Sequence, residues 1–272
     1  MTGRPENPLA GLFCMPKTAI DNQSPLSRLA LLAGEEALAR LADARILVCG
    51  LGGVGSWAAE ALARSGVGHL VLADCDTVAP SNINRQAFAL HSTVGQMKCH
   101  VAATRLKDIA PKTDITYFEQ RLTPQNITSL LKEYCPTAVL DAIDDRPAKL
   151  YLIESCVREG IPLVSSMGAA NRTHPEAVRV MDLFATRGCP MAQVLRKALR
   201  KRGITGGVPC VFSTEAPIEP QAEAAPESNG AKRPMGTLVT VTAVFGMLAA
   251  NALLEPLLNT DTLPRRGDAP RE

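Results

Sequence analysis

A glycine-rich run followed by an aspartate is the part of the chain that most clearly suggests chemistry. The run is Gly50-Leu-Gly52-Gly53-Val-Gly55, and it lies between a short apolar stretch and a pattern of helical spacing. Glycines at this point let a phosphate group approach the backbone and the positive N-terminus of the following helix. Asp74 lies 19 residues beyond Gly55, at the end of the next apolar stretch, where a carboxylate can bind ribose hydroxyls. The pattern predicts a nucleotide site without specifying the nucleotide.

Charged and amide side chains beyond this motif favour a triphosphate over a nicotinamide dinucleotide. A dinucleotide needs little besides the helix N-terminus, whereas a triphosphate that is cleaved needs cations on its phosphates and usually a metal ligand. Groups of these kinds follow at Asp76, Asn82, Arg85, Lys98 and Asp144. We predict that Arg85 and Lys98 contact phosphates and that Asp144, at the carboxyl end of a later strand, binds Mg²⁺. A nicotinamide dehydrogenase or a nucleotide-sensing module stays open as an alternative. Either of these functions would leave Arg85, Lys98 and Asp144 without a role.

Together the motifs resemble the ATP-binding core of the ubiquitin-activating superfamily, whose members adenylate a carboxylate. The resemblance covers about residues 27–184, and it depends on the glycine run, Lys98 and the segments Asp74-Cys-Asp-Thr-Val-Ala-Pro-Ser-Asn-Ile-Asn-Arg-Gln86 and Asp141-Ala-Ile-Asp144. These joint motifs are far more specific than the glycine run alone.

The resemblance implies a role for each matching residue. Asp74 holds the ribose, and Asp144 serves the metal. The phosphates are contacted by Asn82, Arg85 and Lys98. Arg28 reaches the ATP of a neighbouring subunit, which implies a homodimer. The implied catalytic set is therefore Arg28, Arg85, Lys98 and Asp144.

Three further segments are similar to one branch of that superfamily, the tRNA threonylcarbamoyladenosine dehydratases. They are residues 55–68, 208–215 and 237–246. This similarity implies ATP-dependent cyclisation of N6-threonylcarbamoyladenosine next to the anticodon of a tRNA, with ATP and Mg²⁺ as cofactors. ATP activates the threonyl carboxylate, and the carbamoyl group held nearby closes the ring with net loss of water.

An activator of a sulfur-carrier protein that ends in Gly-Gly is the alternative within the same superfamily. Such activators commonly hold zinc between two Cys-x-x-Cys pairs. The eight cysteines here lie at positions 14, 49, 75, 99, 135, 156, 189 and 210, so no such pair occurs and no zinc is predicted. The need for a sulfur-relay partner protein stays open.

A basic stretch on a predicted helix is consistent with a tRNA substrate. It contains Arg196, Lys197, Arg200, Lys201 and Arg202. Such a patch can bind tRNA phosphates, with an affinity that falls steeply with salt. A solvated helix face is an equally good interpretation of a run of charges. The formal net charge of +2 does not decide between them.

Cys210 is the candidate for a functional thiol because it lies in a segment rich in glycine and threonine, which we expect to be a loop. Cys49 and Cys99 lie on apolar faces and are expected in the core. Cys189 stands before a proline where the resemblance implies an acidic residue. An intramolecular cyclisation needs no enzyme nucleophile, so the reaction does not require Cys210.

Apolar runs alternate with helical patterns, which is typical of an α/β fold. We expect a Rossmann-like, doubly wound and mostly parallel sheet with helices on both faces. The expected strands are residues 45–49, 69–73, 114–118, 137–140 and 161–165. The expected helices are residues 28–42, 54–65, 95–110, 147–159 and 190–202, with one more starting at 123.

Length and composition fit one ATP-binding domain. The 272 residues are 46% hydrophobic and 21% charged, which excludes wholesale disorder and coiled coil. Only 4% are aromatic, which argues against a single-strand binder built on stacking. We expect the domain over 25–260, a substrate-side insertion over about 185–235 with a mobile loop at 218–234, and flexible segments at 1–24 and 261–272.

One uncharged segment, from 237 to 254, approaches the length of a membrane span. It contains three threonines and an asparagine, and no Lys or Arg follows until residue 265. We expect a buried helix over 237–258 instead. The N-terminus lacks the apolar core of a signal peptide, so a cytoplasmic location is expected.

Overall fold

The fold is a mostly parallel sheet with helices on both faces, as the alternation predicts, and the sheet has seven strands. The computed structural model describes residues 22–219 and 235–259. The strand order is β3-β2-β1-β4-β5-β7-β6. Every pair is parallel except β6 with β7. The strand order reverses between β1 and β4, and ligands bind at such a point, outside the carboxyl ends of the strands.

Five parallel strands were predicted and all five are present. They are β1 (Arg45–Cys49), β2 (His69–Ala73), β3 (Asp114–Phe118), β4 (Ala138–Asp141) and β5 (Leu163–Ser166). The burial of both faces of the central strands explains their nearly continuous apolar sequences. The first three match their predicted bounds, and the other two are shifted by one or two residues.

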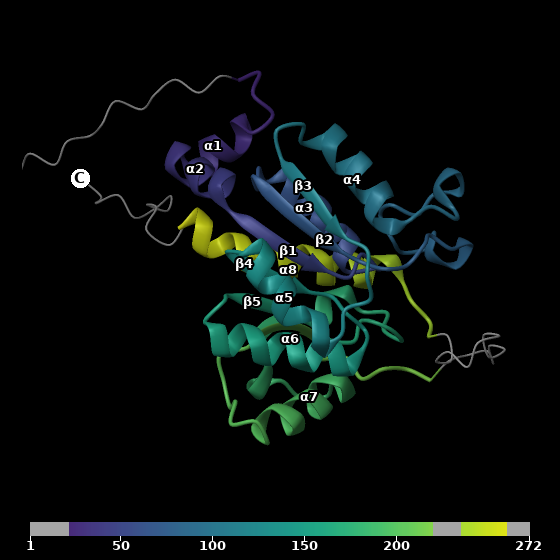
Figure 1. Cartoon of the computed structure of the whole chain (residues 1–272). Coiled ribbons are helices and arrows are strands. Elements are labelled where there is room, and N and C mark those ends of the chain that lie inside the picture. The colour runs from purple at the N-terminus through teal and green to yellow at the C-terminus, as the bar shows by residue number, and fades with distance from the viewer. Residues whose placement is uncertain (1–21, 220–234, 260–272) are drawn as a thin grey trace, which may run out of the picture.

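Helices cover the two faces of the sheet in separate groups (Figure 1). One core packs the sheet against α3 (Gly55–Arg64), α4 (Lys98–Ile109) and α8 (Val239–Leu258). The other packs it against α5 (Pro124–Tyr134), α6 (Arg146–Glu159) and α7 (Pro190–Arg200). Short 3-10 turns occur at Pro80–Asn82, His91–Thr93, Pro175–Ala177 and Leu183–Ala185.

The single helix expected over 28–42 is wrong, because the segment forms two helices. These are α1 (Ser27–Ala33) and α2 (Glu35–Asp43), and Gly34 separates them with a φ of 82°. Glycine adopts this conformation without the steric cost that other residues incur, so the chain bends there. The second helix packs on α8, where the Arg40 side chain donates to the Leu257 carbonyl at 2.7 Å.

Two strands were not predicted. β6 (Val178–Asp182) and β7 (Pro209–Ser213) form an antiparallel pair at the edge of the sheet. β7 pairs with β5, so the region around residues 185–213 is attached to the sheet and is not a separate unit. The expected flexible segments 1–24, 218–234 and 261–272 lie almost wholly outside the described residues, and the domain bounds stay predictions.

The apolar C-terminal helix lies against the core, as predicted. α8 is the one helix in the described part of the chain that is long and apolar enough to span a membrane. Eight of its residues are buried, however, and it packs against α2, α3 and β5. A Cβ added to Gly246 would lie 2.5 Å from the Val54 carbonyl, which shows how closely α8 approaches α3. The helix begins at Val239, two residues later than expected.

Candidate active site

The glycine loop joins β1 to α3 at the carboxyl edge of the sheet. Gly50 has a φ of 91°, and its N–H donates to the Ala73 carbonyl of β2 at 2.7 Å. A Cβ at Gly55 would lie only 1.8 Å from the Gly50 carbonyl oxygen, so the loop closes tightly on itself. A Cβ at Gly52 would meet no protein atom within 4 Å. The loop therefore has a closed inner side and an open outer side, where a phosphate can approach the backbone.

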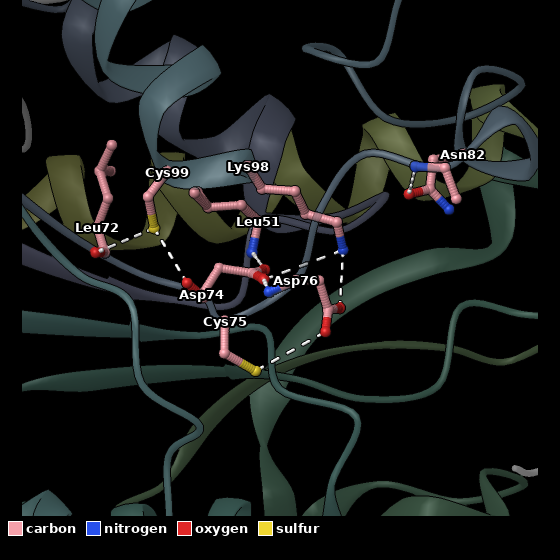
Figure 2. Close-up of polar contacts among 9 residues, drawn as sticks. Leu51, Leu72, Asp74, Cys75, Asp76, Asn82, Lys98 and Cys99 are labelled. Atoms are coloured by element: carbon pink, nitrogen blue, oxygen red, sulfur yellow. Dashed lines mark hydrogen bonds and ion pairs between the residues drawn. The ribbon is translucent and has the colours of Figure 1, made fainter. Parts of the chain in front are cut away.

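The aspartate predicted to bind ribose lies directly beside this loop (Figure 2). The Asp74 carboxylate accepts the Leu51 N–H at 2.6 Å and the Asp76 N–H at 2.9 Å. Burial raises the pKa of Asp74, and the Lys98 ammonium, 4.0 Å away, partly opposes this. The carboxylate is thus fixed by two backbone donors at the end of β2.

The predicted lysine is brought to the same place. Lys98 begins α4, its side chain is buried, and its Nζ lies 2.9 Å from the Asp76 carboxylate. Burial tends to raise the pKa of Asp76, but the hydrogen bond and charge of Lys98, together with Cys75 and Arg121, lower it below its ordinary value. Figure 2 shows the polar ends of Asp74, Asp76 and Lys98 converging beside Leu51 of the glycine loop. The Lys98 ammonium group therefore lies between the carboxylates of Asp74 and Asp76, just after the end of β2.

The loop after β2 places the predicted arginine over the glycines. A Cβ at Gly53 would lie 3.1 Å from Arg85 Cγ, so the arginine side chain covers that part of the loop. Arg85 Nη1 donates to the Ser81 carbonyl at 2.8 Å and to Asn84 Oδ1 at 3.0 Å. Burial lowers the pKa of Arg85. Asn82 accepts the Ala79 N–H at 3.1 Å and so stabilises the turn that carries the arginine.

The fourth predicted residue, Asp144, lies in the loop between β4 and α6 and is exposed. This loop touches the glycine loop, because a Cβ at Gly50 would lie 2.8 Å from the Ala142 carbonyl oxygen. Three segments distant in sequence, around Gly50, Arg85 and Asp144, therefore meet at the reversal of strand order.

A buried ion pair beneath Asp144 was not predicted as part of the site. Asp141 Oδ2 lies 2.9 Å from Lys149 Nζ and accepts the Ser165 hydroxyl at 2.6 Å, and both charged side chains are 0% exposed. Asp141 also accepts the Ile143 N–H at 3.1 Å, while Lys149 donates to the Ile143 carbonyl at 3.1 Å. The pair therefore fixes the loop that carries Asp144. An aspartate closing the apolar run 138–141 was the signal available in the sequence.

The structure does not bring Arg28 to the other predicted residues. It is exposed on α1, which precedes α2 and β1. This helix lies near the amino ends of the strands, opposite the glycine loop (Figure 1). Arg28 makes no hydrogen bond or ion pair within residues 22–219 and 235–259. The neighbouring Leu31 and Leu32 are 61% and 66% exposed.

The basic stretch is only partly available to a ligand. Arg196 donates to the Leu183 carbonyl and the Thr186 hydroxyl, which ties it to the protein. Arg202 forms an ion pair with Glu154 at 2.8 Å. The remaining exposed cations are Lys197, Lys201 and Arg200, and the guanidinium carbon of Arg200 lies 5.6 Å from the centroid of the Phe184 ring. The patch is therefore smaller than the sequence suggests, and Arg196 and Arg202 have structural partners.

The expectation that Cys210 lies in a loop is wrong. Cys210 lies in β7, is 0% exposed, and burial raises the pKa of its thiol to about 12. A nucleophilic cysteine needs the opposite, an accessible thiol with a lowered pKa. Cys189 is also buried, at the start of α7. Cys49 and Cys99 are buried core residues, as predicted.

Comparison with known proteins agrees with this geometry. The ThiF family profile matches residues 26–268. The tRNA threonylcarbamoyladenosine dehydratase of Bacillus subtilis is 38% identical over 249 residues, covering 89% of this chain and 98% of its own length. That of Escherichia coli is 40% identical over 246 residues, covering 84% of this chain and 91% of its own.

A solved structure and a more distant relative complete the comparison. The crystal structure of the E. coli dehydratase TcdA in complex with ATP superposes with a TM-score of 0.79 at 38% identity, covering 87% of this chain and 95% of that one. The molybdopterin-synthase adenylyltransferase of Salmonella typhimurium is 42% identical, but over only 51% of this chain. The chain belongs to the ThiF family, within its branch of tRNA threonylcarbamoyladenosine dehydratases.

Proposed function

We propose that this protein catalyses the ATP-dependent dehydration of N6-threonylcarbamoyladenosine in tRNA to its cyclic form. The observation that carries the proposal is the meeting of the glycine loop, Arg85 and Lys98 at one edge of the sheet. This arrangement suits a triphosphate, and relatives that match it over nearly their whole length are dehydratases of this kind.

The reaction proceeds in two steps. A threonyl carboxylate oxygen forms a bond to a phosphorus atom of ATP, and the bond from that phosphorus to its leaving phosphate breaks. The carbamoyl group then attacks the activated carbonyl carbon and gives up one proton, and the phosphate group departs with one carboxylate oxygen. The net change in the nucleoside is the loss of one water. The protein contributes positioning and stabilisation of developing charge, which is where most of the catalysis in such transfers arises.

Each residue of the site has a role in this proposal. Asp74 binds the ribose, the open side of Gly52 faces the phosphates, and Arg85 and Lys98 stabilise their negative charge. Asn82 contributes by holding the turn that carries Arg85. Lys98 exchanges its partner Asp76 for a phosphate oxygen when ATP binds.

Asp144 is the proposed ligand of Mg²⁺. No cluster of three or more potential metal-binding side chains occurs within the described ranges. A single carboxylate nevertheless fits this ion, because Mg²⁺ keeps several waters and binds through one or two carboxylates together with substrate phosphates. The ion neutralises phosphate charge when bound. The loop held by Asp141 and Lys149 gives Asp144 a fixed position for this contact.

A homodimer with Arg28 acting on the ATP of the partner subunit is part of the proposal. Its support is the position of Arg28 on an exposed helix beside two exposed leucines, far from the glycine loop of its own chain. For tRNA binding we propose Lys197, Arg200 and Lys201. A cytoplasmic location follows from a tRNA substrate.

The test is direct. Purified protein is incubated with ATP, Mg²⁺ and tRNA that carries N6-threonylcarbamoyladenosine, and the digested nucleosides are analysed by mass spectrometry. We expect loss of one water from that nucleoside only when ATP is present. Arg85→Ala and Asp144→Ala should abolish turnover while the variants stay folded, and Lys112→Ala, an exposed change before β3, should not. An unchanged nucleoside despite ATP binding refutes the proposal and directs the search to a carrier protein ending in Gly-Gly.

A further inference from the structure

A small cavity of about 250 Å³ lies beside the site and is lined by none of the residues proposed to bind ATP or Mg²⁺. Its walls come from residues 171–173, which follow β5, and from residues 236–238, which precede α8, with Ile218 and Glu219 at its side. The volume is below the roughly 300–1,000 Å³ typical of drug-sized ligands, so it suits part of a substrate and not a whole nucleotide.

The cavity contains an incompletely paired cation. Arg172 lines it and is only 3% exposed, and its Nε donates to the Gly168 carbonyl at 3.1 Å. Arg172 Nη1 is buried with no hydrogen-bond partner in the described part of the chain. Burying a charged donor without a partner is costly, because the group has lost its water and gained nothing in return. A buried cation of this kind favours negative charge in the cavity that it lines.

A helix N-terminus contributes to the same cavity. Leu238 lines the cavity and is the N-cap of α8, and it offers no side-chain cap to the first turn. The N-terminal end of a twenty-residue helix favours negative charge. Arg172 and the start of α8 therefore both favour an anion, whereas Glu219 is the one carboxylate among the lining residues.

The cavity walls are already in place. The Asn171 N–H donates to the Gly236 carbonyl at 2.8 Å, and the Ile218 N–H donates to the Asn171 carbonyl at 2.8 Å. Asn171 has a φ of 57°, a conformation that asparagine tolerates better than most residues. Glu215 accepts the backbone N–H groups of Thr173 and His174, each at 3.0 Å. The arginine is thus presented by a loop that is held from both sides.

A chain of polar contacts links the cavity to the glycine loop. Thr237 lines the cavity, and its carbonyl and hydroxyl oxygens accept from Asn84 Nδ2 at 3.2 and 3.3 Å. Asn84 in turn accepts from Arg85, whose side chain covers Gly53. A ligand in the cavity is therefore next to the residues proposed to contact phosphates.

We propose that the Arg172 cavity binds the threonyl carboxylate of the modified nucleoside and holds it for attack on ATP. This assignment rests on the proposed function. Arg172 acts as a binding residue: it orients the carboxylate through one oxygen and leaves the other to form the bond to phosphorus. The aliphatic parts of Ile218 and Leu238 provide an apolar wall for the threonyl methyl group.

The test separates this assignment from the function itself. Two anticodon stem-loops are used, one carrying N6-threonylcarbamoyladenosine and one carrying its methylamide, which lacks the negative charge. Their dissociation constants are measured with a non-hydrolysable ATP analogue present. We expect the wild-type protein to prefer the carboxylate by about 10- to 100-fold, the size of a charge-assisted hydrogen bond. No preference in the wild-type protein overturns the assignment, and this readout needs no variant.

Variants then identify the residue. Arg172→Met should remove the preference while leaving the affinity for ATP unchanged, and Arg172→Lys should retain part of it. Arg179→Met, an exposed change on β6, is the matched control and should behave as wild type. An equal loss for both stem-loops, or a loss of ATP affinity, assigns the cavity to a phosphate group and overturns the proposal. If the wild-type protein cyclises the nucleoside but Arg172→Met binds both stem-loops as the wild-type protein does, the assignment of the cavity is overturned while the proposed function stands.

Discussion

Lys149 is a lysine with no solvent contact, and its removal gives the sharpest prediction for stability. Its ammonium group lies 2.9 Å from Asp141, and neither side chain is exposed. Lys149→Met preserves most of the apolar stem but removes the charge. Asp141 would then keep only the Ser165 hydroxyl and the Ile143 N–H as donors.

The expected loss follows from this burial. Removing one partner of a buried ion pair typically costs about 3–5 kcal/mol, because an uncompensated charge is left in the interior. For a domain of this size each 1 kcal/mol lowers Tm by roughly 2–4 °C. We therefore expect Tm to fall by about 6–20 °C. The loop that carries Asp144 should also lose its anchor, since Lys149 donates to the Ile143 carbonyl.

The assay is urea unfolding followed by circular dichroism, with thermal melts as a second measure. Lys132→Met, on the exposed face of α5, is the matched control and should change stability by less than about 0.5 kcal/mol. The double variant Asp141→Asn/Lys149→Met should be more stable than the sum of the two single losses predicts, because no lone charge remains. A loss under about 1 kcal/mol for Lys149→Met, or strict additivity in the double variant, refutes the reasoning.

Four further substitutions test the glycine loop, Asp74 and the ion pairs of Glu60. Gly55→Ala should destabilise the fold by about 1–3 kcal/mol because its Cβ would collide with the Gly50 carbonyl. Gly52→Ala, whose Cβ meets no protein atom, should reduce the affinity for ATP and leave stability unchanged. Thermal melts and ATP titration distinguish the two effects. Asp74→Asn should weaken ATP binding by about 10- to 100-fold without unfolding the protein, as measured by calorimetry. Burial tends to raise the pKa of Glu60, but hydrogen bonds from two arginines hold it below its ordinary value. The stability that ionised Glu60 adds to the fold is therefore present at neutral pH, and it is lost as pH falls through the folded-state pKa of Glu60. Glu60→Gln should cost about 1–2 kcal/mol at pH 7, and this cost should fall as the carboxylate becomes protonated in acid; a cost that does not change with pH would contradict the pairing.

The sequence predicted best those parts of the site that depend on local pattern. The glycine run lies between an apolar strand and a helix, and this local pattern alone indicates a tight turn at the carboxyl end of the strand. Asp74 and Lys98 were predicted to lie near it because each stands at the end of an element. The partner of Lys98, Asp76, was known only as a candidate, because ion pairing depends on how α4 returns to the sheet.

Errors arose where tertiary packing decides the outcome. Cys210 stands among residues typical of loops, but pairing with β5 and β6 makes its segment a buried strand. The run of cations on α7 looked continuous, yet the structure pairs Arg196 and Arg202 with other elements. Nothing in the sequence around Arg172 indicates a site, because only the meeting of two distant segments creates its cavity.

The position of α8 has a consequence for how the protein folds during its synthesis. This helix follows every strand in the sequence, yet it covers the sheet beside α3, and Thr237 just before it holds Asn84 in the loop that carries Arg85. A nascent chain that has emerged only to β7 exposes the apolar face of α3 and lacks this contact. Such intermediates are prone to aggregate, so chaperone capture during synthesis should be strongest before residues 239–258 leave the ribosome. Docking of α8 after it leaves the ribosome thus closes the core and brings Thr237 to Asn84.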